Sequence, residues 1–179
     1  MKTCKIGICG TQSVGKSTLV KSLSEHPKFK NFQTFFEESE KIKNMGVSLN
    51  QDSTLLGQMV FMGYRAKELI PPFIITDRTI IDVMAFTLSS KTMNYPDKER
   101  FVDLAKRVLG DYDYIFYISP EGIPVEDNGV RETDEEYRNE IDSAIKFLSN
   151  QYGGLIKNFN TISGTTEERI SQIVKVIGL

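Results

Sequence analysis

Eight consecutive residues near the start of the chain have the types and spacing of a phosphate-binding loop. They run from Gly10 to Ser17 and fit G-x-x-x-x-G-K-[ST] at every fixed position. Gly10 and Gly15 permit backbone conformations in which successive amide groups point into one concavity, where a polyphosphate can bind. Lys16 would span the β- and γ-phosphates, and Ser17 would offer its hydroxyl to Mg²⁺.

The segments that flank this loop have the order that such a site requires. Residues 4–9 are short, apolar and typical of a buried strand. After the loop, Leu19, Val20 and Leu23 recur at helical spacing, and Pro27 ends the pattern. This context disfavours a glycine turn that binds nothing. We therefore expect nucleotide contacts from Gly10, Ser13, Val14, Gly15, Lys16, Ser17 and Thr18.

A second polar set follows the strand predicted at 73–76. Asp77 stands where a Mg²⁺-orienting carboxylate or an acceptor-binding acid is expected, although an Asp here could instead cap the next helix. Arg78 can hold a phosphate or an acceptor bidentately, and its alternative is a surface ion pair. The site would thus draw residues from more than one strand end.

Glu37 and Glu38 follow the strand predicted at 31–36. Side chains alternate along a strand, so only one of the two can face the cleft, and the residues alone do not decide which. That carboxylate could act as a general base toward an acceptor hydroxyl or hold a sugar hydroxyl.

A closing lid is predicted at about 120–140, where breaker residues and charges are frequent. Arg131 and Arg138 would stabilise the charge on the transferring phosphoryl group while the lid excludes water. Alternatively, both arginines pair with neighbouring acids on a solvated face.

Strand and helix patterns alternate along the chain. The predicted strands are 4–9, 31–36, 73–76, 114–118 and 159–162, and the helical patterns after the first are 52–69, 80–88, 101–110, 133–152 and 165–177. Asp52 is the expected cap of the second helix, whose apolar stripe is Leu55, Met59, Met62, Ala66 and Leu69. Residues 39–51 form a variable polar segment, and 91–96 is expected to be a loop. Thr133 with Glu136 and Thr165 with Glu168 are the predicted caps of the last two helices.

This alternation predicts an α/β fold in three layers, a doubly wound parallel sheet of five strands with a helical lid, in a single domain over 1–179. Ligands of such sheets bind beyond the carboxyl ends of the strands. The phosphate loop, the acidic pair and the Asp77-Arg78 step would therefore converge on one cleft.

Composition narrows the classes of function. The net charge of −2 and the pI near 5.6 argue against a protein that coats nucleic acid. We expect Cys4 and Cys9 to be thiols in a reducing compartment. There is no basic and apolar leader and no apolar run of membrane-spanning length, so a cytoplasmic protein is expected.

The chain resembles the P-loop nucleoside and nucleotide kinase superfamily. The resemblance is carried by the phosphate loop, by the arginine-bearing lid, and by Asp77, Arg78, Asp82, Ala85 and Phe86. Thymidylate kinases end the third strand with Asp-Arg and have Ala and an aromatic residue at the same offsets. The lid stretch 127–131 followed by Arg138 looks like that of the ribosylnicotinamide kinase group and its small phage and bacterial relatives.

The resemblance implies Mg²⁺-ATP as phosphoryl donor and a nucleoside monophosphate or nucleoside, deoxy forms included, as acceptor. Lys16, Asp77, Arg78, Arg131 and Arg138 would be catalytic, Ser17 with Asp77 would hold the metal, and Glu37, Glu38, Asp77 and Arg78 would bind the acceptor. No membrane or nucleic-acid partner is expected, and a homodimer is left open.

Two other classes of protein compete with a kinase of nucleotide metabolism. A GTPase would need an Asn/Thr-Lys-x-Asp segment after a late strand, and residues 117–120 read Tyr-Ile-Ser-Pro. A regulatory or DNA-associated P-loop ATPase without a small acceptor stays open, because the loop by itself indicates only nucleotide binding.

Overall fold

A parallel sheet of five strands forms the centre of the computed structural model, which describes residues 3–123 and 134–178. The strand order is β2-β3-β1-β4-β5. The strands are β1 Cys4–Cys9, β2 Gln33–Phe35, β3 Phe73–Asp77, β4 Tyr114–Ile118 and β5 Phe159–Ile162. In the β1–β3 register Ile8 lies opposite Asp77, so the phosphate loop and the Asp77-Arg78 step leave the sheet at the same edge.

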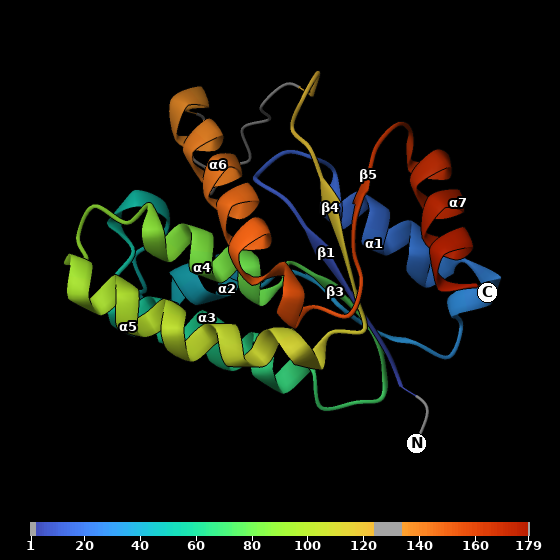
Figure 1. The fold of residues 1–179 in the computed structure, drawn as a ribbon, viewed down its shortest axis with the longest axis horizontal. Helices are drawn as coiled ribbons and strands as arrows, with labels where there is room; N and C mark the ends of the chain where they lie inside the picture. The colour runs from blue at the N-terminus through green and yellow to red at the C-terminus, as the bar shows by residue number, and fades with distance from the viewer. Residues whose placement is uncertain (1–2, 124–133, 179) are drawn as a thin grey trace.

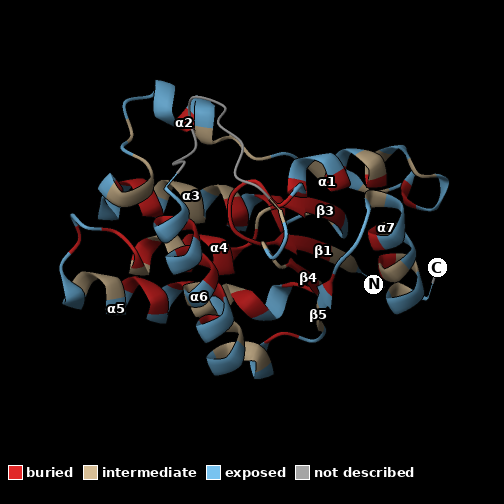
Figure 2. Ribbon diagram, turned by 90° about the horizontal axis from the view of Figure 1, so that it is seen from above, coloured by how far each residue is buried: buried red, intermediate tan, exposed pale blue. Residues whose placement is uncertain are grey.

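Helices cover both faces of this sheet. The α-helices are α1 Lys16–Glu25, α2 Ser39–Asn44, α3 Leu55–Glu68, α4 Ile80–Leu88, α5 Tyr95–Ala105, α6 Glu135–Tyr152 and α7 Thr166–Ile177. The short 3-10 helices are η1 Pro27–Phe29, η2 Asn50–Asp52, η3 Lys106–Asp111 and η4 Gly153–Leu155. Helices α1 and α7 lie on one face, and α3 to α6 lie on the other (Figures 1 and 2).

Neighbouring strand residues belong to different hydrophobic cores. Ile75 and Phe116 pack in the core under α1 and α7, whereas Ile74 and Ile115 pack in the core under α3 to α6. Alternation along each strand thus supplies apolar side chains to both faces, as a covered parallel sheet requires. The predicted three-layer α/β fold is confirmed.

The start of α3 differs from the prediction. Thr54 is the N-cap, and its hydroxyl accepts a hydrogen bond from the amide of Gly57 at 3.2 Å. The predicted cap at Asp52 is therefore wrong, because Asp52 ends η2.

The buried face of α3 also differs from the predicted apolar stripe. Leu55, Met59 and Ala66 on that stripe are exposed, whereas Arg65 and Glu68 are buried. The two buried residues form an ion pair, while Met62 and Leu69 of the predicted stripe do pack against the core.

Three other boundaries were mispredicted or fall outside the described residues. Segment 39–51, for which only a variable polar stretch was predicted, contains the short helix α2, and α5 begins at Tyr95 within the predicted loop 91–96. Asp134 caps α6, while Thr133, the predicted cap, lies outside the described residues. Among the described residues, every helix is too short or too polar to cross a membrane.

Candidate active site

The phosphate loop connects β1 to α1 and has a backbone that turns repeatedly into the left-handed region. The φ angles are 152° at Gly10, 59° at Ser13 and 83° at Gly15. A Cβ atom on Gly10 would lie 2.8 Å from the carbonyl oxygen of Ile118, so only glycine fits there without displacement of β4. Gly15 is the N-cap of α1, which directs the positive end of that helix at the loop.

Lys16 is buried in this loop, with 6% of its surface exposed. Its Nζ donates a hydrogen bond to the carbonyl oxygen of Thr11 at 2.6 Å. Burial, followed by repulsion from Arg78, lowers the pKa of Lys16 to about 8. The ammonium is therefore poorly compensated by the protein alone, and a polyphosphate would supply the missing negative charge.

A pocket of about 320 Å³ opens above the loop. One wall consists of the phosphate loop, and the other residues come from the segments that follow β2, β3, β4 and β5 and from α7. The lining residues outside the loop are Glu37, Asp77, Arg78, Ile123, Gly164, Thr165, Thr166 and Arg169. The strand ends thus converge on the site as the sheet topology predicts.

Asp77 faces this pocket with a carboxylate that accepts no hydrogen bond from the described residues. It is 1% exposed, and in the part of the chain that the structure describes neither carboxylate oxygen has a hydrogen-bond partner. It does not cap α4, because the hydroxyl of Thr79 accepts from the amide of Ile81 and performs that role. A buried carboxylate without a donor is a group for which a ligand is expected.

The donor set fits Mg²⁺. Ser17 and Asp77 line the same pocket, so one hydroxyl and one carboxylate are within the site. No cluster of three His, Cys, Asp or Glu suited to a metal exists among the described residues. This combination matches an ion that takes few ligands from protein and the remainder from water and phosphate.

Glu37 and Arg78 form an ion pair at the pocket, with Arg78 Nε 3.3 Å from Glu37 Oε1. The guanidinium of Arg78 also lies over the ring of Phe86, 5.0 Å from its centroid. Burial is the largest single influence and acts to raise the pKa of Glu37, but Arg78, a hydrogen bond from Ser39 and Lys16 together outweigh it, and the pKa lies below its usual value. Glu38 instead pairs with Lys41 at the surface, so Glu37 is the acid that faces the site.

Arg138, at the start of α6, binds the main chain of the phosphate loop and does not line the pocket. Its Nε donates to the carbonyl oxygen of Gln12 at 3.2 Å, and a second nitrogen donates to that of Ile123 at 2.6 Å. Arg138 is not among the described residues that line the pocket. Arg131, the other predicted lid arginine, lies outside the described residues.

Arg169 of α7 is a pocket residue that the sequence reasoning missed. It is 8% exposed, and its guanidinium donates to the carbonyl oxygen of Val14 at 2.9 Å. The rule that ligands bind beyond strand ends, applied to β5 as well, would have indicated the first turn of α7.

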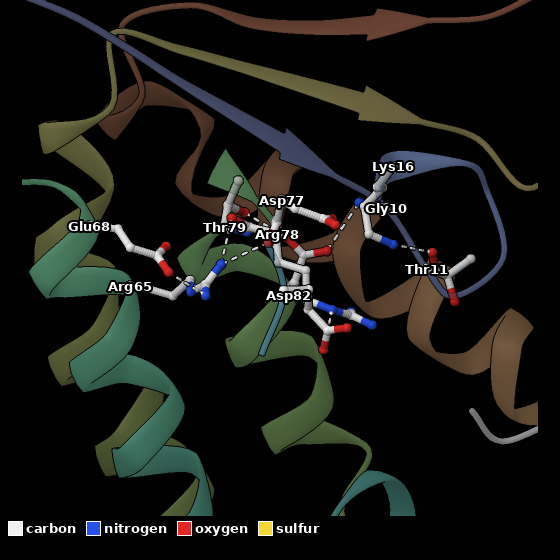
Figure 3. A network of polar contacts seen from close by, with 10 residues as sticks. Gly10, Thr11, Lys16, Arg65, Glu68, Asp77, Arg78, Thr79 and Asp82 are labelled. Carbon is white, nitrogen blue, oxygen red and sulfur yellow. Dashed lines mark hydrogen bonds and ion pairs between the residues drawn. The ribbon is translucent and has the colours of Figure 1, made fainter. Parts of the chain in front are cut away.

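Asp82, one of the residues that carry the resemblance to the kinase superfamily, contacts the loop directly. One carboxylate oxygen accepts from the amide of Gly10 at 3.1 Å, and the other accepts from the amide and hydroxyl of Thr79 at 2.7 and 2.8 Å (Figure 3). The N-terminus of α4 is thereby joined to the phosphate loop.

Comparison with known proteins gives a family and a fold. A family model described as an AAA domain matches residues 5–169. No curated protein matches the chain by sequence.

Several solved structures share the fold at low identity. Deoxyadenosine kinase from M. mycoides, with the products dCMP and a flexible dCDP bound, is 18% identical with a TM-score of 0.67 over 97% of this chain and 98% of that one. The NadR protein in complex with NR is 16% identical with a TM-score of 0.74, over 99% of this chain and 52% of that one. The YorR protein from Bacillus subtilis, in complex with phosphorylated GDP, is 13% identical with a TM-score of 0.60, over 97% and 95%.

Proposed function

Because this chain belongs to the AAA domain family and has the fold of the P-loop nucleoside and nucleotide kinases, we propose that it is a phosphotransferase. It transfers the γ-phosphoryl group of Mg²⁺-ATP to a nucleoside or a nucleoside monophosphate. The observation that carries the proposal is the placement of Glu37, Asp77 and Arg78 around the phosphate loop in one pocket. Holding a nucleotide alone does not require this second set of charged groups.

The donor half of the reaction uses the loop. Its amides and Lys16 hold the phosphates, and Ser17 with Asp77 would hold Mg²⁺, which neutralises charge that develops on the phosphoryl oxygens. Arg131 is proposed to act on the transferring group, and Arg138 to keep the loop in shape through its contact with Gln12.

The acceptor half uses the Glu37–Arg78 pair. An ionised carboxylate at the pocket can accept a proton from an acceptor hydroxyl, and its lowered pKa keeps it ionised at neutral pH. One terminal nitrogen of Arg78 has no hydrogen-bond partner among the described residues and can bind an acceptor phosphate or hydroxyl. The deoxyadenosine kinase with this fold binds deoxynucleotides and the NadR protein binds NR, which supports the same acceptor class here.

A screen of nucleosides and nucleoside monophosphates with Mg²⁺-ATP tests the proposal. ADP and phosphorylated acceptor are measured together, and the two should form in equal amounts with at least one acceptor. If nucleosides are the best acceptors, Glu37 is indicated as the general base. If monophosphates are the best acceptors, binding of the acceptor phosphate by Arg78 is the more important contribution. ADP release that no acceptor alters would contradict the proposal and favour a regulatory ATPase.

A further inference from the structure

Two buried charges lie behind the strand end that carries Asp77 and Arg78, on the side away from Lys16 (Figure 3). They are Arg65 and Glu68 of α3, which are 3% and 4% exposed and pair at 2.7 Å. Neither is among the described residues that line the pocket. Burying two charges is costly, and a well-packed apolar pair is often at least as stable, so stability alone does not account for them.

Arg65 contacts the main chain of the site. One of its terminal nitrogens donates to the carbonyl oxygen of Asp77 at 2.8 Å and to that of Arg78 at 3.3 Å. The other terminal nitrogen binds Glu68, so the guanidinium is fixed between the helix and the strand end. A planar donor with several N–H groups can make these contacts together, which a lysine cannot.

Arg78, whose carbonyl oxygen is one of the two that Arg65 contacts, has an unusual backbone conformation. Arg78 has a φ of +83°, which a residue with a side chain rarely adopts. Such a conformation persists only where surrounding contacts determine it. The amide of Arg78 donates to the carbonyl oxygen of Ile8 at 3.0 Å, and just beyond it Asp82 accepts from the amide of Thr79.

We propose that Arg65, held by Glu68, is a positioning residue for phosphoryl transfer. It keeps the main chain of Asp77 and Arg78 in the conformation that presents both side chains to the phosphate loop. This inference rests on the proposed function, because it assigns Arg65 a role in transfer. Loss of the contact should lower turnover more than nucleotide affinity, since the loop amides and Lys16 hold the nucleotide independently.

The test removes both charges together, in the double variant Arg65→Met/Glu68→Leu. A single substitution would leave one buried charge unpaired and could prevent folding, whereas the apolar pair should keep the fold. The matched control is Lys106→Met/Asp103→Leu, which removes an ion pair with the same sequence spacing at the surface.

The double variant should keep its unfolding temperature and bind ADP within about threefold of the wild type, while kcat falls by about 10- to 100-fold. The control should show wild-type kcat. A crystal structure of the double variant should show Arg78 with a negative φ. An unchanged kcat in the folded variant, or an unmoved Arg78 backbone, overturns the inference. If the wild type phosphorylates no acceptor, the proposed function fails, and the crystal structure still decides whether Arg65 sets this backbone.

Discussion

Lys16→Met separates the chemical role of Lys16 from its role in the fold. The substitution removes the ammonium that we expect to contact the transferring phosphate, and it keeps all but the last atom of the length of the buried side chain. Met is flexible and apolar, so it should fill the same space without strain. Transfer should fall by about 10²- to 10³-fold, the usual loss when a charge-stabilising donor is removed.

The expected change in stability follows from the pKa of Lys16. A pKa lowered from 10.5 to about 8 means that the ligand-free pocket disfavours the ammonium by roughly 3 kcal/mol. The lost hydrogen bond to Thr11 offsets about 1 kcal/mol of that. At pH 7, where Lys16 is charged in both the folded and the unfolded protein, Lys16→Met should therefore raise the free energy of unfolding by roughly 2 kcal/mol. The gain should shrink as the pH rises from 8 toward 10.5, because folded wild type then loses the proton first.

Urea unfolding at pH 7 and pH 10 and the transfer assay with Mg²⁺-ATP measure these two effects. Lys106→Met is the control, because Lys106 pairs with Asp103 at the surface. A variant that transfers phosphate at the wild-type rate would remove Lys16 from the mechanism. A variant less stable than wild type at pH 7 would show that the ammonium is well compensated in the empty pocket.

Four further outcomes are expected. Asp77→Asn should fold but need at least about tenfold more Mg²⁺ for half-maximal activity, as a metal titration would show; an unchanged requirement would exclude Asp77 as a ligand. Gly10→Ala should lower the free energy of unfolding by at least about 1–3 kcal/mol, measured in urea, because its Cβ meets Ile118 at a positive φ. Arg131→Ala should lower turnover more than ATP affinity in steady-state kinetics, and the reverse pattern would make it a surface residue. Burial raises the pKa of Glu68 from 4.5 to about 7, so its contribution to stability is present below pH 4.5 and lost as the pH rises through 7; the double variant Arg65→Met/Glu68→Leu, which lacks this carboxyl group, should lose this slope from the pH dependence of unfolding.

The elements with strong local signals were predicted well. β1, β4 and β5 are short apolar or β-branched runs, and their observed bounds match those predicted. The capping box of Thr165 and Glu168 at the start of α7 is confirmed, because both of its hydrogen bonds depend on residues within one turn. These features require no knowledge of distant parts of the chain.

Elements that depend on tertiary contacts were predicted poorly. α2 is six residues long and buries only Ile42 among its side chains, so it has no helical periodicity to detect. The sequence could not distinguish Glu37 from Glu38, because the partner of Glu37 is Arg78, which follows a different strand, β3. Likewise, Arg65 binds main-chain carbonyl groups. Every residue has a carbonyl group, so the side-chain types in the sequence could not indicate these partners.

The phosphate loop depends on two arginines that lie far from it in the sequence, and it is therefore not an independent structural unit. The carbonyl groups of Gln12 and Val14 accept hydrogen bonds from Arg138 and Arg169, more than 120 residues later in the chain. An isolated peptide with the same eight-residue motif would lack both supports. If the motif is transplanted into another scaffold, its sequence alone should therefore not reproduce the anion-binding conformation. Two guanidinium groups that bind the same loop carbonyls would have to be transplanted with it.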